Sequence, residues 1–449
     1  MKIGIIGVGY VGLTTAICLA SMKHEISIFD INEEKIKQIR EKKLPFFEKG
    51  LQEMLENVIS SGNLIPAKNL NELVDNTEGC FVCVGTPTKS NSIDLTQIIS
   101  AVKSLAGSIK HNDKNGYKII IRSTIIPNTA RNTILPILSD KLSELKFGLC
   151  VVPEFLREGN ALDDFMNPDK IVIGSTDKNS IIFVKKIFQN FKDKCEFIET
   201  SLESAELIKY TNNAFFSMLI SFSNEIANIT EKIPGVDSHE ILKALVSDKR
   251  ITSIVNNERI IPSLESYLIP GCGFGGSCFP KDVQAILDYA NKNKIKTPLL
   301  NAILEINAER PNKMVILSES ILGTLKNKKV SILGLTFKPE TDDLRSSPAL
   351  DAIEILLEKG ANISTFDPIL KSKSDLVKLP NECKICFRIE DALRDSDVVM
   401  IFTKWSEFKS LDAKFLRQFM KNPIIIDGRG FLDKEKFDVG TYFKIGYSE

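Results

Sequence analysis

The chain has 449 residues, which is long for a single hydrophobic core, so we expect two or three domains. Lysine plus arginine equals aspartate plus glutamate at 58 each, which leaves no overall charge to attract nucleic acid or an anionic membrane surface. Nine cysteines, an odd number without a dense framework, favour a reducing cytoplasm over a disulfide-built secreted domain.

Two cysteine pairs, Cys80/Cys83 and Cys383/Cys386, have the CxxC spacing found in zinc sites. The first pair lies in an apolar run that predicts a strand, where residues three apart point to opposite faces. The three histidines lie far from one another and from any carboxylate cluster. The sequence therefore predicts no metal site.

The amino terminus reads KIGIIGVGYVG, a short apolar run that continues as Gly7-x-Gly9-x-x-Gly12 and then as a helical pattern. Alone it could pass for a signal peptide or a short membrane span. The glycine spacing within the run and the absence of another long apolar run favour a soluble chain. Because the glycines follow a predicted strand and precede a predicted helix, they favour a dinucleotide-binding turn over a glycine-rich turn without a ligand. The next predicted strand ends on Asp30, whose carboxylate suits the adenosine ribose and would repel a 2′-phosphate. The predicted cofactor is therefore NAD, with its pyrophosphate at the helix N-terminus.

Two further apolar runs, FVCVGTP and KIIIRSTIIP, end in small hydroxyl residues and proline. Buried parallel strands have this composition. Because ligands bind at the carboxyl ends of such strands, Thr86, Ser123 and Thr124 are predicted at the cofactor rim.

The same pattern returns late in the chain as KKVSILGLTFKP, SSPALDAIEILLEKG, ANISTFDP, DVVMIFTKW and PIIIDGR. ISTFDP echoes ISIFD, and IIIDGR echoes IIIRST, which predicts a second nucleotide-binding-type sheet. Its turn lacks the glycine triplet and has Lys338, with Arg345 nearby. These cations suit a phosphorylated ligand rather than a second dinucleotide, and solvated surface charges are the alternative interpretation.

Residues 201–233 lie between the two halves and have apolar side chains at helical spacing without a proline. The pattern predicts one long helix that links the domains and offers a dimer surface. Lys209 and Asn213 are four residues apart, so they share one face of this helix, which is either a solvated stripe or an active-site face.

The stretch GCGFGGSCFPKD, residues 271–282, places Cys278 between glycines and a Lys281-Asp282 pair. Glycines admit a close approach of ligand to backbone, and a nearby ammonium favours the reactive thiolate. The stretch predicts either a nucleophilic cysteine or a glycine-rich turn with an unreactive thiol.

Taken together, these motifs resemble those of the UDP-glucose/GDP-mannose dehydrogenase family. The resemblance runs nearly end to end: GVGYVG at 7–12, VGTP at 84–87, STIIP at 123–127, PEFLREG at 153–159, ELIKYTNNAF at 206–215, GFGGSCFPKD at 273–282 and GLTFKPETDDLRSSP at 334–348.

The resemblance implies an α/β fold with two Rossmann-like, doubly wound parallel-sheet domains, joined by a long central helix and a helical middle domain. The expected domains are an NAD-binding domain at 1–200, a helical dimerisation domain with the cysteine loop at 201–310, and a second Rossmann-like domain for the UDP-sugar at 311–449.

The implied reaction is a four-electron oxidation of the sugar C6 alcohol to a carboxylate, using two NAD⁺. Cys278 would hold the intermediate aldehyde as a thiohemiacetal, whose oxidation gives a thioester that water hydrolyses. Residues 153–174 are most similar to the enzymes that act on UDP-glucose. GDP-mannose enzymes share PEFLREG and remain the alternative, whereas the branch for N-acetylated UDP-sugars is disfavoured.

The resemblance also implies roles for single residues. Lys209 would stabilise oxyanions at C6, with help from Asn213. Asp282 with Thr124 would hold a water and serve the first deprotonation, and Glu158 is the expected base for thioester hydrolysis, with Glu154 nearby. The residues matching cofactor contacts are Gly7, Gly9, Tyr10, Val11, Gly12, Asp30, Lys35, Gly85, Thr86, Thr124, Glu158, Lys281 and Arg345. Those matching substrate contacts are Glu154, Phe155, Leu156, Lys209, Asn213, Arg250, Tyr267, Gly271, Phe274, Gly275 and Lys338.

Two departures from the family pattern are visible. The family places an Arg-Ile pair before the glycine-rich loop to reach the partner subunit's substrate, and here Arg250 and Arg259 both qualify. The motif DGRG has Gly430 where the family often has asparagine, beside Arg429, an expected nucleotide contact.

Two other functions fit parts of this pattern. A β-hydroxyacid dehydrogenase performs one oxidation and would need neither Cys278 nor the second sheet. A non-catalytic nucleotide-sugar-binding protein would be expected to lose Cys278, Lys209 or Asp282, and all three are present. The expected partners are UDP-glucose and a second copy of the chain.

Overall fold

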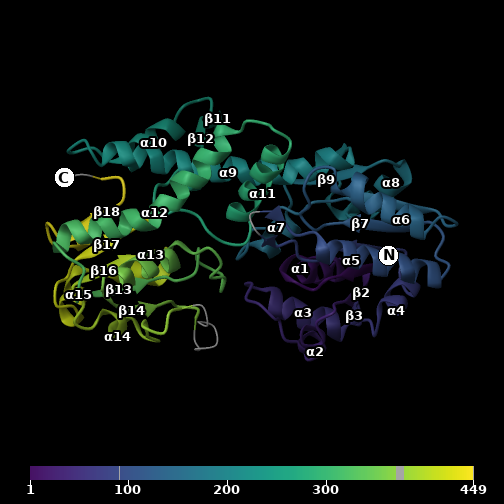
Figure 1. The fold of residues 1–449 in the computed structure, drawn as a ribbon, viewed down its shortest axis with the longest axis horizontal. Coiled ribbons are helices and arrows are strands. Elements are labelled where there is room, and N and C mark those ends of the chain that lie inside the picture. The colour runs from purple at the N-terminus through teal and green to yellow at the C-terminus, as the bar shows by residue number, and fades with distance from the viewer. Residues whose placement is uncertain (90–91, 371–378, 448–449) are drawn as a thin grey trace. The chain divides into compact units, whose positions relative to one another are not determined.

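A computed structural model describes residues 1–89, 92–370 and 379–447 of the chain. The chain divides into two compact units, Met1–Asn212 and Asn213–Glu449, and each contains its own sheet (Figure 1). Within the described ranges, no helix is both long and apolar enough to cross a membrane.

The first unit is built on an eight-stranded sheet with the order β10-β9-β8-β7-β4-β1-β2-β3. Six neighbouring strands of this sheet, β8-β7-β4-β1-β2-β3, are parallel and have the strand order of a dinucleotide-binding fold, as predicted. β9 joins β8 antiparallel and β10 joins β9 parallel, so the sheet is mixed at this end. The strands are β1 (Lys2–Ile6), β2 (Glu25–Phe29), β3 (Leu64–Pro66), β4 (Gly79–Val82), β7 (Tyr117–Ile121), β8 (Phe147–Val151), β9 (Lys170–Ser175) and β10 (Glu196–Thr200).

Helices cover both faces of this sheet, and its central strands β1, β4, β7 and β8 are therefore apolar and almost fully buried. One face packs against α1 (Tyr10–Ser21), α3 (Leu51–Ser60), α7 (Ala161–Met166) and α8 (Lys178–Ile187). The other packs against α4 (Leu70–Asp75), α5 (Thr96–His111) and α6 (Leu135–Lys141). Cys80 and Cys83 lie in the cores on opposite faces, as their strand spacing predicts.

The second unit contains a six-stranded sheet with the order β15-β14-β13-β16-β17-β18, in which every neighbouring pair is parallel. This order matches that of the six parallel strands of the first sheet, so the predicted second nucleotide-binding-type sheet is confirmed. Its elements are β13 (Lys329–Leu333), α13 (Pro348–Glu358), β14 (Asn362–Phe366), β15 (Lys384–Ile385), α14 (Ile389–Leu393), β16 (Val398–Ile401), α15 (Ala413–Phe419), β17 (Ile425–Asp427) and β18 (Tyr442–Lys444).

The predicted long helix is α9 (Leu202–Thr230), and the boundary between the units falls within it. It is followed by α10 (Ser238–Val246), the hairpin of β11 (Ser253–Val255) and β12 (Glu258–Ile260), α11 (Phe279–Lys292) and α12 (Pro298–Leu322). These elements form one compact unit with the second sheet. The division at 201–310 and 311–449 stays a prediction.

The turns after β1 and β13 have the same hydrogen bonds, which extends the sequence repeat to atomic detail. Gly7 N donates to Phe29 O and Gly334 N donates to Phe366 O, both at 2.9 Å. The next amides, Val8 N and Leu335 N, donate to the carboxylates of Asp30 and Asp367, both at 2.7 Å. In each sheet, an aspartate that follows the second strand therefore fixes the turn that follows the first.

Candidate active site

The turn between β1 and α1 has the shape that a dinucleotide pyrophosphate needs. Gly7 has φ +90°, and a Cβ at Gly12 would lie 1.9 Å from Gly7 O, so both positions require glycine. A Cβ at Gly9 would have no neighbour within 4 Å. The turn is therefore closely packed inside and open where a phosphate approaches the start of α1.

Asp30, at the end of β2, accepts from Val8 N and from Asn32 N, which fixes its carboxylate beside the turn. Lys35 lies in the first turn of α2 (Glu33–Arg40) and is half-buried. The geometry suits the predicted ribose contact of Asp30.

The hydroxyl residues predicted at the cofactor rim lie at the ends of the adjacent strands β4 and β7. Thr86 Oγ1 donates to Thr124 O at 2.8 Å, and Ser123 Oγ donates to Val84 O at 2.7 Å. These bonds tie the two strand ends together, on either side of Gly85. Contact of these residues with a cofactor stays a prediction.

The loop after β8 places Glu154 against Lys209 of α9. Glu154 Oε1 lies 3.0 Å from Lys209 Nζ, and both side chains are buried, with exposed fractions of 6% and 4%. Leu156 N donates to Glu154 Oε2 at 2.6 Å, and the Phe155 ring centroid is 5.6 Å from the ammonium. The structure thus brings together four residues that the family resemblance singles out.

Burial alone would raise the pKa of Glu154. The charge and hydrogen bond of Lys209, with smaller effects of Leu156 N and Arg122, outweigh it and hold the pKa below its ordinary value. Glu154 is therefore ionised at neutral pH.

In the second unit, Cys278 is the N-cap residue of α11, directly before Phe279 and Pro280. The N-terminus of a helix favours negative charge, and a thiol there is more readily ionised. Ser277 Oγ lies 3.6 Å from Cys278 Sγ, and Asp282 N donates to Cys278 O at 2.8 Å. The cysteine therefore lies at a helix N-terminus, a position that favours a negatively charged side chain.

Asp282 lies one turn further along α11 and is almost fully buried. Its Oδ2 accepts from Asn213 Nδ2 at 2.6 Å, and its Oδ1 pairs with Lys281 Nζ at 2.5 Å. The amide of α9 and the lysine of α11 fix both carboxylate oxygens. Asn213, Lys281 and Asp282 are thus one cluster, although the resemblance gives Lys281 a separate cofactor role.

The glycine-rich loop before Cys278 is held by polar side chains of α9 and α12. Asn224 of α9 accepts from Gly271 N, and Arg310 of α12 donates to Gly271 O. Asn307 of α12 bonds both the N–H and the C=O of Phe274. The sequence motifs do not identify these side chains as supports of the loop. The available signal is that Asn307 and Arg310 are polar residues three apart on the inward side of a helix.

The same loop packs against the turn after β13. Gly276 N donates to Arg345 O, and a Cβ at Gly276 would lie 2.7 Å from the Phe337 ring. A Cβ at Gly275 would lie 2.1 Å from Ser346 O. The structure therefore brings the glycine-rich loop against the predicted phosphate-binding turn, where Lys338 Nζ lies 5.6 Å from the Phe337 ring centroid.

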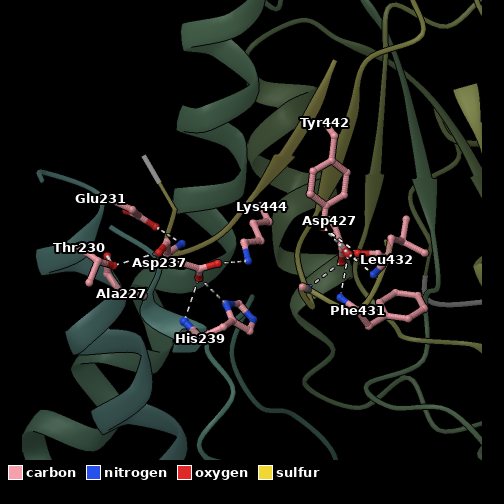
Figure 2. Close-up of polar contacts among 12 residues, drawn as sticks. Ala227, Thr230, Glu231, Asp237, His239, Asp427, Phe431, Leu432, Tyr442 and Lys444 are labelled. Atoms are coloured by element: carbon pink, nitrogen blue, oxygen red, sulfur yellow. Dashed lines mark hydrogen bonds and ion pairs between the residues drawn. The ribbon is translucent and has the colours of Figure 1, made fainter. Parts of the chain in front are cut away.

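Asp427, at the end of β17, shapes the loop that carries Arg429. Figure 2 shows its carboxylate accepting from several backbone N–H groups and from the Tyr442 hydroxyl. Arg429 in turn donates to Phe402 O at 2.6 Å and to Gly273 O at 2.9 Å. Arg429 thus connects this loop to the glycine-rich loop.

Gly430 stands where the family often has asparagine, and His239 of α10 lies close to it. Gly430 has φ +59°, and a Cβ there would lie 2.3 Å from Nε2 of His239. The ring is held by Asp237, which pairs with Lys444 at 2.5 Å. Burial and the charge of Lys444 lower the pKa of His239, so the ring is neutral at neutral pH.

The remaining predicted contacts lie at exposed or aromatic positions. Arg250 is exposed and pairs with Asp248 at 2.8 Å, and Arg259 of β12 donates to Ser247 O. These contacts do not distinguish which of the two arginines corresponds to the one that the family uses at the partner subunit's substrate. The Tyr267 ring centroid lies 4.5 Å from that of Phe216 and 6.4 Å from that of Phe279, next to Cys278.

Comparison with known protein families agrees with this geometry. Models of the UDP-glucose/GDP-mannose dehydrogenase family match the NAD binding domain at residues 1–192, the central domain at 203–309 and the UDP binding domain at 331–434. The chain belongs to this family. It is therefore an NAD-dependent oxidoreductase with a UDP-sugar-binding domain.

Curated relatives and solved structures cover the whole chain. A UDP-glucose 6-dehydrogenase of Rickettsia bellii is 37% identical over 99% of both chains, and one of Bacillus subtilis is 34% identical over 98% of this chain and 92% of its own. A UDP-glucose dehydrogenase of Pyrobaculum islandicum superposes with a TM-score of 0.89 at 30% identity, covering 99% of this chain and 98% of that one.

The ion pair between Glu154 and Lys209 gives a stability prediction. Glu154→Gln leaves a buried ammonium without its counter-charge and should lower the free energy of unfolding by about 3–5 kcal/mol. Because the pKa of Glu154 is lowered in the folded state, this contribution is present above its unfolded value of 4.5 and is lost as pH falls through the folded pKa. Urea unfolding of both proteins across this pH range measures the difference.

The exposed pair Lys2–Glu25 supplies the control. Glu25→Gln should change the free energy of unfolding by less than about 1 kcal/mol at any pH. Equal losses in the two variants, or a Glu154→Gln loss that grows below pH 4.5, would contradict the assignment.

Proposed function

We propose that the chain oxidises C6 of UDP-glucose to the carboxylate of UDP-glucuronate, using two NAD⁺ and one water. The observation that carries the proposal is Cys278 at the N-cap of α11, with the buried carboxylate of Asp282 fixed one turn away. A dehydrogenase that stopped at the aldehyde would have no use for this thiol. The names of the curated relatives support UDP-glucose as the sugar nucleotide.

The first oxidation removes the hydroxyl proton and one hydride from C6 and leaves an aldehyde. Bound NAD⁺ supplies the chemistry of hydride acceptance in each oxidation. The Gly7–Gly12 turn and Asp30 hold the cofactor, and Asp282 receives the hydroxyl proton through a water. Lys209 and Asn213 stabilise the negative charge that develops on the C6 oxygen.

In the second oxidation, the Cys278 thiolate adds to the aldehyde carbon, and the carbonyl oxygen becomes the oxyanion of a thiohemiacetal. Loss of a second hydride from C6 converts this adduct to a thioester. Water then attacks the thioester carbonyl, the C–S bond breaks, and the carboxylate leaves while the thiol is restored. The balance is one alcohol, two NAD⁺ and one water giving one carboxylate, two NADH and three protons.

We propose Glu154 rather than Glu158 as the base for thioester hydrolysis, a different choice from the one that the family resemblance implies. Glu154 is ionised and lies 3.0 Å from Lys209, the proposed oxyanion stabiliser. The charge of Glu158 acts on Tyr10, which lies in the cofactor turn. We therefore assign Glu154 to the reacting carbon and Glu158 to the cofactor.

The proposed assembly is a dimer through α9. Phe215, Phe222 and Ile229 are spaced seven residues apart, so they lie on one side of the helix, with exposed fractions of 46%, 41% and 55%. An exposed apolar stripe of this kind is typical of a protein interface.

The first measurement is the amount of NADH formed per mole of limiting UDP-glucose with excess NAD⁺. We expect two NADH per sugar for the unaltered protein, and a failure to complete the second oxidation for Cys278→Ala. Cys195→Ala removes a partly exposed thiol outside the glycine-rich loop and should still form two NADH per sugar. One NADH from the unaltered protein refutes the thiohemiacetal route, and activity with GDP-mannose alone refutes the substrate.

The assignment of the base is tested by single-turnover kinetics with intact mass measurement. Glu154→Gln should form both NADH but accumulate a thioester on Cys278, with hydrolysis slowed by about 10²–10⁴-fold. Glu158→Gln should hydrolyse the thioester normally and bind NAD⁺ more weakly. Thioester accumulation in Glu158→Gln would overturn the assignment, even if Glu154→Gln proved too unstable to assay.

Light scattering tests the dimer. The unaltered protein should have the mass of two chains, and Phe222→Glu should reduce it to one because a charge then lies in the apolar contact. Ile316→Glu, a change at an exposed apolar residue of α12, is the control and should remain dimeric. A monomeric mass for the unaltered protein would refute the proposal.

A further inference from the structure

We propose that Glu48 is a positioning residue that couples the cofactor turn to the loop carrying Glu154 and Glu158. The proposal rests on the dehydrogenase function proposed above and assigns a role to a residue outside the family motifs that the sequence displays. Glu48 lies in PFFEKG, before α3, and gives no periodic or motif signal.

Glu48 is only 4% exposed, and both of its carboxylate oxygens are used. Its Oε2 accepts from the Tyr10 hydroxyl and from Gly159 N at 2.8 Å. Its Oε1 accepts from Ala161 N at 2.8 Å. One buried carboxylate therefore joins three donors from two segments that are about 150 residues apart in the sequence.

Each end of this connection belongs to a functional segment. Tyr10 is the first residue of α1 and lies within the glycine turn that holds the cofactor. Gly159 has φ +76° and directly follows Glu158, and Ala161 begins α7. Gly159 N also lies 3.2 Å from the Tyr10 hydroxyl oxygen, so the two segments meet at the carboxylate.

The protonation state of Tyr10 fixes the direction of these bonds. Burial, the hydrogen bond to Glu48 and the charges of Glu48 and Glu158 raise the pKa of Tyr10, so the phenol keeps its proton and donates. All three partners of Glu48 are therefore donors. A glutamine would direct amide hydrogens at one of them and could not replace the carboxylate.

The position of Glu48 is itself fixed by packing. The ring centroids of Phe46 and Tyr10 are 4.9 Å apart, and Leu51, the first residue of α3, is fully buried in the core shared with α1. Glu48 therefore has a rigid place from which to hold both segments. By linkage, cofactor binding that orders the turn also orders the Glu158 loop, and a change in that loop alters cofactor affinity.

The test compares Tyr10→Phe, Glu48→Gln and the double variant, with Glu53→Gln as the control. Glu53 is an exposed glutamate of α3, so its substitution should change nothing. NAD⁺ affinity is measured by titration calorimetry without sugar, and kcat and KM for NAD⁺ are measured with UDP-glucose.

Coupling predicts that each single variant weakens NAD⁺ binding about tenfold and lowers kcat by a similar factor, the scale of one lost charge-assisted hydrogen bond. Because both changes break the same connection, the double variant should be no worse than Glu48→Gln. Multiplicative losses in the double variant would overturn the proposal. Unchanged affinity and kcat in Tyr10→Phe, which keeps both backbone bonds, would also overturn it.

The two proposals fail in distinguishable ways. An unaltered protein that binds NAD⁺ but forms no NADH from UDP-glucose counts against the proposed function, whereas the calorimetric comparison still decides the coupling. Thermal unfolding of each variant separates a local effect from a general loss of fold. If Glu48→Gln does not fold, the NAD⁺ affinity and kcat of Tyr10→Phe decide the proposal.

Discussion

A carboxylate that accepts a backbone N–H at the end of a strand is the interaction on which both halves of this protein depend. Asp30 bonds the turn after β1, and Asp367 bonds the turn after β13, with equal distances and equivalent partners. A turn that must expose N–H groups to a phosphate cannot also satisfy them internally. The neighbouring strand supplies an acceptor from the side, and the turn keeps its shape without a ligand.

Buried carboxylates hold further loops in the same way. Asp427 binds successive amides of the loop that carries Arg429, and Glu48 binds the amides that follow Glu158. A charged acceptor makes stronger bonds to N–H groups than a neutral one, and one carboxylate can satisfy several donors. Irregular loops at the edges of the two sheets can therefore be rigid although they lack secondary structure. Rigidity of this kind is what a site needs to hold reacting groups in place.

The sequence predicts the features that depend on patterns among neighbouring residues. Glycine spacing, apolar runs and helical periodicity locate the turn at Gly7, α9 and the second sheet because each depends on residues close together in the chain. The antiparallel pairing of β8 and β9 and the role of Glu48 leave no such signal, because they depend on residues far apart. Gly430 is the clearest case: the family pattern marks it as a departure, and the imidazole of His239, far away in the sequence, lies where its Cβ would be.

Successive turns of α9 serve two buried carboxylates in different ways. Lys209 gives Glu154 a full opposite charge, whereas Asn213 gives Asp282 a neutral amide, beside the partly exposed ammonium of Lys281. A full charge at 3.0 Å holds the buried carboxylate of Glu154 ionised, and the amide of Asn213 fixes the orientation of the Asp282 carboxylate. The proposed reaction needs both conditions, since thioester hydrolysis requires a carboxylate that is already ionised and the first deprotonation requires one that is held in place. Two residues one turn apart on one helix therefore fix two of the carboxylates to which the proposed reaction assigns proton transfers.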